Sequence, residues 1–205
     1  MLAIVPVRGR NGKHRLDGFL SAGERSRLVA AMLADVTRAC SRAESVAATL
    51  VVTPDPRIAP EGADVLADEG AGHEEAIACA LADPRARAGA LVVMADCPLV
   101  TPQALDRLAR SARPVALVPA RDGGLNALAL SESGVVDPVF GVPGAAAEML
   151  ARARSRGLEP AVLDEPSLAF DVDDPADVWE VRRSGGGTTT QAFLGAVLPP
   201  TGGLR

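Results

Sequence analysis

Three aspartates that follow apolar stretches are the residues of this chain with the most evident chemistry. Asp96 comes directly after the uncharged run 91–95, which is typical of a central parallel strand covered on both faces. Asp171 and Asp173 follow a second apolar patch, and the one residue between them would place both carboxylates on the same face of an extended chain. Ligands of open α/β sheets bind at the carboxyl ends of the strands, so we expect these carboxylates to share one site.

The chemistry that such a site favours is metal-assisted. Mg²⁺ needs only one or two protein carboxylates when phosphate and water fill its other positions. Asp96 and Asp171 meet that demand, and Asp173 is a further candidate ligand.

A basic loop follows the first apolar stretch and suits an anionic ligand. It carries Arg8, Arg10, Lys13 and Arg15 within eight residues, and a solvated basic turn is the alternative interpretation. The loop is not a P-loop, because His14 stands where a Ser or Thr would follow Gly-Lys, and it lacks the dinucleotide pattern GxGxxG.

Two further segments could contact the same ligand. Asp55 follows the predicted strand 46–53, where it either touches the ligand or caps a turn. Gly72 precedes a predicted helix over 73–81 whose free N–H groups could meet a phosphate or a base edge. Glu74, in the first turn of that helix, either contacts the nucleotide or balances the helix dipole.

Composition limits the classes of partner. The 205 residues are enough for one domain, and a net charge of −5 with 2% aromatic residues argues against nucleic acid. Apolar runs are too short for a membrane span, and Arg8 interrupts the first run before it could serve as a signal peptide, so we expect a cytoplasmic protein.

Cys40, Cys79 and Cys97 are odd in number and widely spaced, which favours reduced packing residues. The sequence sets no oligomeric state, and a homodimer is one arrangement it allows.

Strand and helix patterns alternate along the chain and predict a mainly parallel sheet with helices on both faces. A capping box at Ser21 and Glu24 opens the first helix, and Thr101 caps another. Gly123 and Gly124 permit a late hairpin. The predicted strands are 1–7, 46–53, 63–67, 91–96, 115–119, 127–130, 161–163 and 168–170. The other predicted helices are 73–81, 145–156 and one that begins at Pro175 and runs through Trp179 to Val181. We expect Trp179 to pack on the sheet. The domain is predicted to span 1–183, with a flexible C-terminal tail over 184–205.

Several short motifs follow one another along the chain. They are Pro6-Val7-Arg8, Lys13-His14-Arg15-Leu16, Ala31-Met32-Leu33-Ala34-Asp35, Val52-Thr53-Pro54-Asp55, Ala95-Asp96-Cys97-Pro98-Leu99, Arg121-Asp122-Gly123-Gly124-Leu125-Asn126-Ala127-Leu128, Phe140-Gly141 and Phe170-Asp171-Val172-Asp173-Asp174-Pro175-Ala176-Asp177. Taken in this order, they resemble the 2-phospho-L-lactate or phosphoenolpyruvate guanylyltransferases of deazaflavin (coenzyme F-420) biosynthesis, often called CofC or FbiD.

The resemblance implies a Rossmann-like nucleotide-diphospho-sugar transferase fold and transfer of GMP from GTP to a small phospho-acid. It implies that Asp96 and Asp171 hold Mg²⁺ and that Asn126, Gly141 and Gly144 contact the acceptor. The residues that we predict to contact the nucleotide are Pro6, Val7, Arg8, Lys13, Asp55, Gly72 and Glu74.

The chain departs from the family pattern in both pockets. Where the family commonly has Lys-Thr-Arg-Leu, this chain has His14 in place of the Thr. Where the family has Gly-Leu-Asn-x-Ala, this chain has Gly72-His73-Glu74-Glu75-Ala76. Asn126 replaces a Thr that is found in some members. Gly144 stands where a hydroxyl residue is frequent, so we expect room there for a bulkier acceptor. Another nucleotide, or another phospho-acid or phosphonate acceptor, is therefore the alternative.

Charge explains the reaction without a covalent intermediate. The acceptor phosphate is already an oxyanion near neutral pH, so it can attack the α-phosphorus while pyrophosphate leaves, and two Mg²⁺ ions can clamp the attacking and leaving oxygens. Lys13 and Arg15 would stabilise the developing charge. The competing classes are a nucleotide-binding protein without turnover, which the retained charges argue against, and an NAD-linked oxidoreductase, which lacks its glycine fingerprint.

Overall fold

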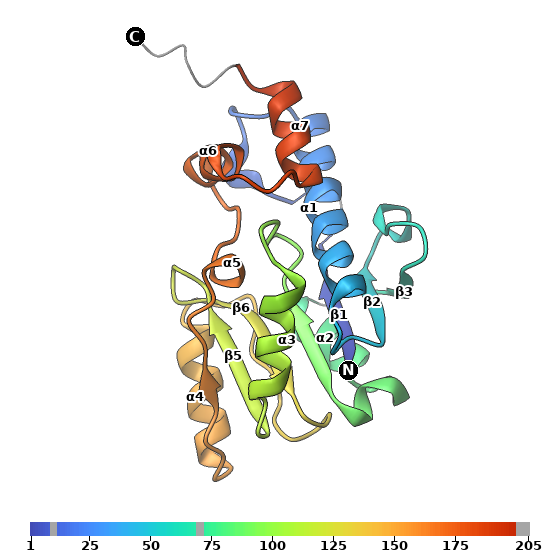
Figure 1. Ribbon diagram of the computed structural model, residues 1–205, viewed down its shortest axis with the longest axis vertical. Helices are drawn as coiled ribbons and strands as arrows, with labels where there is room; N and C mark the ends of the chain where they lie inside the picture. The colour runs from blue at the N-terminus through green and yellow to red at the C-terminus, as the bar shows by residue number, and fades with distance from the viewer. Residues whose placement is uncertain (9–11, 69–71, 200–205) are drawn as a thin grey trace.

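A mixed sheet of seven strands forms the centre of the computed structural model, which describes residues 1–8, 12–68 and 72–199 (Figure 1). The strands β1, β2, β3 and β4 are mutually parallel, whereas β6 runs antiparallel to both β4 and β5. In spatial order they are β3 (Asp64–Ala67), β2 (Ala48–Thr53), β1 (Leu2–Pro6), β4 (Ala90–Val93), β6 (Leu125–Leu130), β5 (Val115–Pro119) and β7 (Ala161–Val162). The predicted mainly parallel sheet with a late hairpin is confirmed.

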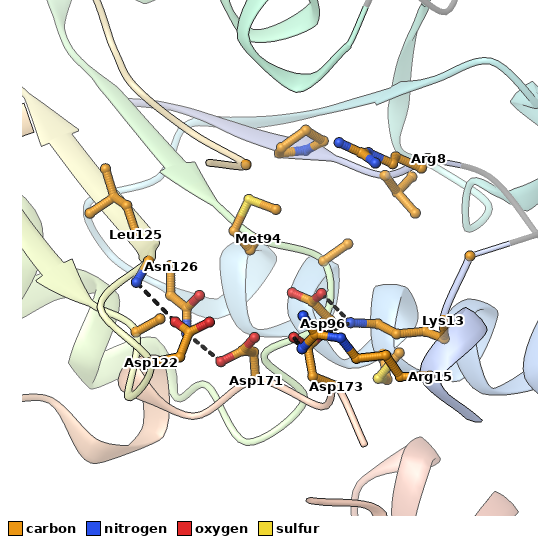
Figure 2. Close-up of a pocket in the computed structure, with 18 of the residues that line it drawn as sticks. Arg8, Lys13, Arg15, Met94, Asp96, Asp122, Leu125, Asn126, Asp171 and Asp173 are labelled. Carbon is orange, nitrogen blue, oxygen red and sulfur yellow. Dashed lines mark hydrogen bonds and ion pairs between the residues drawn. The ribbon is translucent and has the colours of Figure 1, made fainter. Parts of the chain in front are cut away.

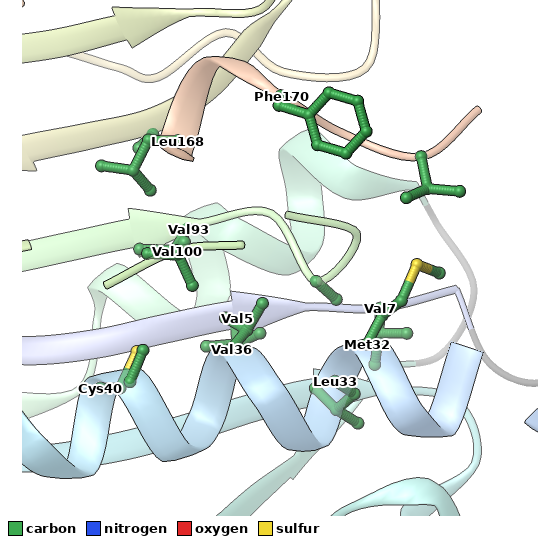
Figure 3. Packing of buried hydrophobic residues seen from close by; sticks show 14 of the residues in the cluster. Val5, Val7, Met32, Leu33, Val36, Cys40, Val93, Val100, Leu168 and Phe170 are labelled. Atoms are coloured by element: carbon green, nitrogen blue, oxygen red, sulfur yellow. The ribbon is translucent and has the colours of Figure 1, made fainter. Parts of the chain in front are cut away.

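The sheet has a hydrophobic core on each face because successive residues of its buried strands point in opposite directions. Ala3 and Val5 belong to one core, and Leu2 and Ile4 belong to the other. Figure 3 shows the first core, where Val36 of a long helix packs beside Val5. Helices α1 (Ala22–Arg42) and α3 (Pro102–Ser111) cover this face, and α2 (His73–Leu81) and α4 (Ala145–Ser155) cover the other.

Local capping signals place the two helices of the first face. Ser21 accepts a hydrogen bond from the Glu24 amide while the Glu24 carboxylate accepts one from the Ser21 amide, as the sequence predicted. Thr101 accepts from the Ala104 amide, and Pro102 occupies the first turn of α3, where a missing N–H costs nothing. These caps fix where α1 and α3 begin, after β1 and β4 respectively.

The predicted flexible tail is wrong for the residues up to 199. Helix α6 (Pro175–Arg183) is followed by α7 (Thr189–Val197), which packs along α1 (Figure 1). The buried carboxylate of Asp35 on α1 accepts hydrogen bonds from the amides of Thr189 and Thr190 at 2.7 and 2.8 Å and from the Thr190 hydroxyl at 2.7 Å. Residues 200–205, the end of the predicted tail, lie outside the described residues.

Two other expectations are also wrong. The segment predicted as a strand over 168–170 contains the end of a helical turn, α5 (Pro166–Ala169), because Pro166 starts a turn whose later amides reach the Glu165 carbonyl. Trp179, expected on the sheet, packs edge to face on Phe19, with 6.3 Å between the ring centroids. Val178 and Val181 form the buried side of α6, so the neighbouring indole points elsewhere. Within the described ranges, no helix is long and apolar enough to cross a membrane.

Candidate active site

A cavity of about 490 Å³ opens at the carboxyl ends of β1 and β4, beside the start of β6 (Figure 2). The lining comes from six separate segments of the chain. Its described residues are Pro6, Val7, Arg8, Gly12, Lys13, His14, Arg15, Val29, Met32, Met94, Ala95, Asp96, Ala120, Asp122, Gly124, Leu125, Asn126, Gly141, Val142, Pro143, Asp171 and Asp173.

The three predicted carboxylates meet in this cavity. Asp96, Asp171 and Asp173 each present an oxygen within 4.8 Å of the others. Val172 is fully buried between the last two, and its amide donates to the Asp96 carbonyl at 3.0 Å. This backbone bond holds the 171–173 segment extended beside the turn that follows β4. Both flanking aspartates therefore point into the cavity, as the alternation predicted.

Two cations of the basic loop balance these carboxylates. The Lys13 ammonium lies 2.6 Å from Asp96 Oδ2 and 2.8 Å from Asp173 Oδ1, and an Arg15 guanidinium nitrogen lies 2.9 Å from Asp173 Oδ2. Burial alone would lower the pKa of Lys13, but the attraction of Asp96 and Asp173 outweighs it and raises that pKa above its ordinary value. The lysine is therefore a permanent positive charge inside the site.

Asp171 has a different environment from its neighbours. Its Oδ1 accepts a hydrogen bond from the Asn126 amide nitrogen at 3.1 Å, which favours the charged form. Burial, aided by repulsion from Asp96 and Asp173, outweighs that bond and raises the pKa of Asp171 to about 6. Three crowded oxygen donors of this kind fit a hard divalent cation, whose charge would relieve the repulsion between them. The cluster could therefore hold a metal ion.

Some of the predicted nucleotide contacts line the cavity and others do not. Pro6, Val7 and Arg8 line it together with Lys13, whereas Asp55, Gly72 and Glu74 are outside the described lining. Arg10 lies outside the described residues, so its part in the loop stays a prediction.

The three residues outside the lining have local structural roles. Asp55 accepts from the Arg57 amide and so caps the short turn that follows β2. Gly72, with a φ of 113°, precedes α2. Glu74 lies 3.3 Å from Arg152 of α4.

The predicted acceptor contacts divide in the same way. Asn126 and Gly141 line the cavity, whereas Gly144 does not and instead starts α4 with a φ of +74°. A side chain at Gly144 would be strained in that backbone conformation, so the residue is explained by local geometry.

Sequence reasoning missed several lining residues of the acceptor side. Asp122 accepts a bond from the Gly124 amide at 2.9 Å, a turn signal that we interpreted only as part of a hairpin. Met94, Leu125, Val142 and Pro143 add apolar surface that the sequence does not distinguish from core.

Solved structures share this fold. One, from Desulfovibrio desulfuricans G20 and provisionally assigned as a nucleotide-diphospho-sugar transferase, has a TM-score of 0.76 at 18% identity, covering 95% of this chain and 94% of its own. A nucleotidyl transferase from Methanothermobacter has a TM-score of 0.63 at 17% identity, covering 95% of this chain and 98% of its own. These likenesses define the fold as that of the nucleotide-diphospho-sugar transferases, with an acidic cluster at the carboxyl edge of the sheet.

Sequence relatives narrow the class. The model of the guanylyl transferase CofC-like family matches residues 1–198. A phosphoenolpyruvate guanylyltransferase from Sphaerobacter thermophilus is 40% identical over 88% of this chain and 91% of its own length. A 3-phospho-D-glycerate guanylyltransferase from Phenylobacterium zucineum is 35% identical over 94% of each. A 2-phospho-L-lactate guanylyltransferase from Natronomonas pharaonis is 34% identical over 91% of this chain and 87% of its own length. The chain belongs to the CofC-like guanylyltransferase family.

Proposed function

We propose that this enzyme transfers GMP from GTP to the phosphate of phosphoenolpyruvate or 2-phospho-L-lactate and releases pyrophosphate, a step of deazaflavin cofactor biosynthesis. The observation that carries the proposal is the cavity itself, in which three carboxylates face the cations of the loop after β1. Relatives that act on three different phospho-acids, according to their names, lie at similar identities. We place phosphoenolpyruvate first among the candidate acceptors because the relative at 40% identity is named for it.

The cations define the nucleotide side of the cavity. Among the described lining residues, every positive side chain comes from the loop after β1, and Arg8 and Arg15 extend the charge of Lys13 along it. A triphosphate carries several negative charges, so it would lie along this loop with its α-phosphorus near Asp96. A bound divalent cation, for which Mg²⁺ is the best match to all-oxygen ligands, would supply further charge neutralisation there.

The opposite wall suits a small phospho-acid. The hairpin and the turn at Gly141 contribute Asn126 and Asp122, with Val142 and Pro143 as apolar surface. Asn126 is positioned by the hydrogen bond that its amide nitrogen donates to Asp171. The described lining offers no cation on this wall, so neutral donors such as the Asn126 amide would have to bind an acceptor carboxylate.

The reaction needs positioning more than acid–base chemistry. An oxygen of the acceptor phosphate forms a bond to the α-phosphorus, and the bond from that phosphorus to the bridging oxygen of pyrophosphate breaks. A phosphate monoester is largely dianionic at neutral pH, so no residue has to remove a proton from it. Lys13 and Arg15 then stabilise charge on the departing pyrophosphate.

A matrix of substrates tests the proposal. Pyrophosphate release should be measured for GTP, ATP, CTP and UTP against phosphoenolpyruvate, 2-phospho-L-lactate and 3-phospho-D-glycerate, with the product mass confirmed. We expect the highest kcat/KM for GTP with phosphoenolpyruvate. The variant Glu148→Gln changes an exposed carboxylate of α4 outside the cavity, so it should retain the activity of the wild type. A GTP-induced rise in Tm without pyrophosphate release from any pair would refute transferase activity and indicate a nucleotide-binding protein.

A further inference from the structure

Lys13 is the only lysine in the chain. The sequence contains 21 Lys and Arg residues, and all except residue 13 are Arg. The two side chains differ physically, because an ammonium is a compact, strongly hydrated point charge on a flexible stem, whereas a guanidinium is a planar fork. Only the ammonium resembles a small metal cation in size and in the number of oxygens it can gather around one point.

The ammonium lies against two of the three carboxylates of the candidate metal site. Its nitrogen contacts Asp96 at 2.6 Å and Asp173 at 2.8 Å, and the lysine side chain is only 12% exposed. These are two of the three carboxylates that lie within 4.8 Å of one another. Mg²⁺ requires its oxygen ligands at about 2.0–2.1 Å in near-octahedral geometry. The ammonium and a divalent cation would therefore compete for the same two carboxylates.

The backbone at Lys13 is also unusual. Its φ is 64°, and among the described residues no other residue except glycine has a positive φ. This left-handed conformation is unfavourable for a residue with a side chain, so it persists only where surrounding contacts impose it. The Leu16 amide donates to the Lys13 carbonyl at 3.0 Å, which holds the backbone while the side chain can turn about its own bonds.

We propose that the Lys13 ammonium is an internal counter-ion that occupies the metal position of the nucleotide-free enzyme, and that a divalent cation binds there only as Lys13 withdraws. The withdrawn ammonium takes the phosphates of the nucleotide as its new partner, a part that rests on the proposed function. Metal and nucleotide then strengthen each other's binding, and this coupling is necessarily reciprocal. Metal affinity in the absence of nucleotide is correspondingly low.

Metal binding without nucleotide tests the counter-ion directly. Mn²⁺ affinity should be measured by electron paramagnetic resonance for the nucleotide-free wild type and Lys13→Met, which keeps an unbranched side chain and removes its charge. We expect Lys13→Met to bind Mn²⁺ at least about tenfold more tightly, which corresponds to about 1.4 kcal/mol. Equal or weaker binding by Lys13→Met would overturn the proposal.

Two arginine variants separate displacement from a general effect of charge. Arg15 touches Asp173 but is 72% exposed, so Arg15→Met should gain clearly less Mn²⁺ affinity than Lys13→Met. Arg85 lies in the turn before β4, at the other end of that strand from Asp96, so Arg85→Met should match the wild type. Equal gains in Lys13→Met and Arg15→Met would show a charge effect alone and refute displacement.

A single lysine also permits a measurement on the wild type, which removes any concern that a variant fails to fold. Protein labelled with ¹³C-lysine has one ε-carbon resonance. Saturating Mg²⁺ should shift that resonance and narrow it as the side chain leaves Asp96 and Asp173. Mg²⁺ binding without any change in the resonance would mean that the ion uses other oxygens, and the proposal would be wrong.

A nucleotide arm distinguishes failure of this inference from failure of the proposed function. The analogue guanosine 5′-(α,β-methylene)triphosphate should raise the Mn²⁺ affinity of the wild type more than that of Lys13→Met. If the Lys13→Met gain appears without any effect of the analogue, the counter-ion stands and the proposed nucleotide is wrong. If the analogue raises Mn²⁺ affinity equally in both proteins and the Lys13→Met gain is absent, the proposed function stands and the counter-ion is refuted.

Discussion

Replacing Asp35 should release helix α7 from the body of the enzyme. The carboxylate accepts three hydrogen bonds at the amino end of α7, from the amides of Thr189 and Thr190 and from the Thr190 hydroxyl. A carboxylate at a helix N-terminus also interacts favourably with the helix dipole. Asp35→Ala removes every one of these acceptors, whereas Asp35→Asn retains one oxygen and places an NH₂ group toward the donors.

The burial of Thr190 sets the size of the effect. Thr190 is fully buried, so in Asp35→Ala its amide and hydroxyl lose their partner without gaining water, at about 1–3 kcal/mol for each unsatisfied group. Thr189 is partly exposed, and its amide can bond to solvent instead. We expect a loss of about 3 kcal/mol of unfolding free energy for Asp35→Ala and about half of that for Asp35→Asn. For a protein of this size, 3 kcal/mol lowers Tm by roughly 6–12 °C.

Denaturation and hydrogen exchange together provide the assay. Urea unfolding gives the free energies of the wild type and both variants, and exchange measured by mass spectrometry shows whether the amides of 189–197 lose protection. Guanylyl transfer at 25 °C should persist, because Asp35 does not line the cavity. Glu148→Ala, which removes an exposed pair with Arg152, should leave Tm unchanged. A loss below about 0.5 kcal/mol in Asp35→Ala, or unchanged protection of α7, would refute the reasoning.

Three further predictions concern the site and its support. Asp96→Asn should lower turnover at least about 100-fold, which is equivalent to about 2.7 kcal/mol of barrier. It should lower Tm little, because Lys13 keeps its ion pair with Asp173. Turnover within threefold of the wild type would contradict this prediction. Burial by itself would raise the pKa of Asp106, but hydrogen bonds from Ser45 and the Glu44 amide hold that pKa below its ordinary value. The ionised Asp106 therefore stabilises the fold above the unfolded-state pKa of about 3.9, and this stabilisation is lost as the pH falls through the folded-state pKa. The stability difference between wild type and Asp106→Asn, from urea unfolding, should therefore shrink below about pH 4, and a constant difference down to pH 3 would contradict it. Gly144→Ser should lower Tm through backbone strain at a φ of +74° but leave the ratio of kcat/KM for phosphoenolpyruvate and a larger phospho-acid unchanged; a changed ratio would place residue 144 at the acceptor.

Local signals in the sequence predicted most of the elements and the metal cluster. The capping box at Ser21 and Glu24 lies within four residues, so it can be recognised without knowledge of the fold. The alternation around Val172 likewise needs only the period of an extended chain, and it placed Asp171 and Asp173 on the correct side.

Contacts between distant residues could not be predicted in this way. Nothing in the residues around Asp35 indicates that its carboxylate caps a helix more than 150 positions later. The helix itself had a readable signal, because Thr188 and Gln191 form a capping box, but the preceding glycine run at 185–187 suggested flexibility instead. Gly144 is not among the described lining residues, and its backbone angle, which the residue type allows but does not specify, explains the glycine.

The ion pair between Lys13 and Asp173 joins residues that are 160 positions apart. A ribosome that adds about 5–20 residues per second needs roughly ten to thirty seconds to synthesise the intervening chain. Throughout that time the nascent polypeptide has its basic loop and, later, Asp96, but neither Asp171 nor Asp173. The cluster of three carboxylates is therefore complete only after Asp173 has been synthesised, and a chain that terminates before Asp171 would lack two of its three members.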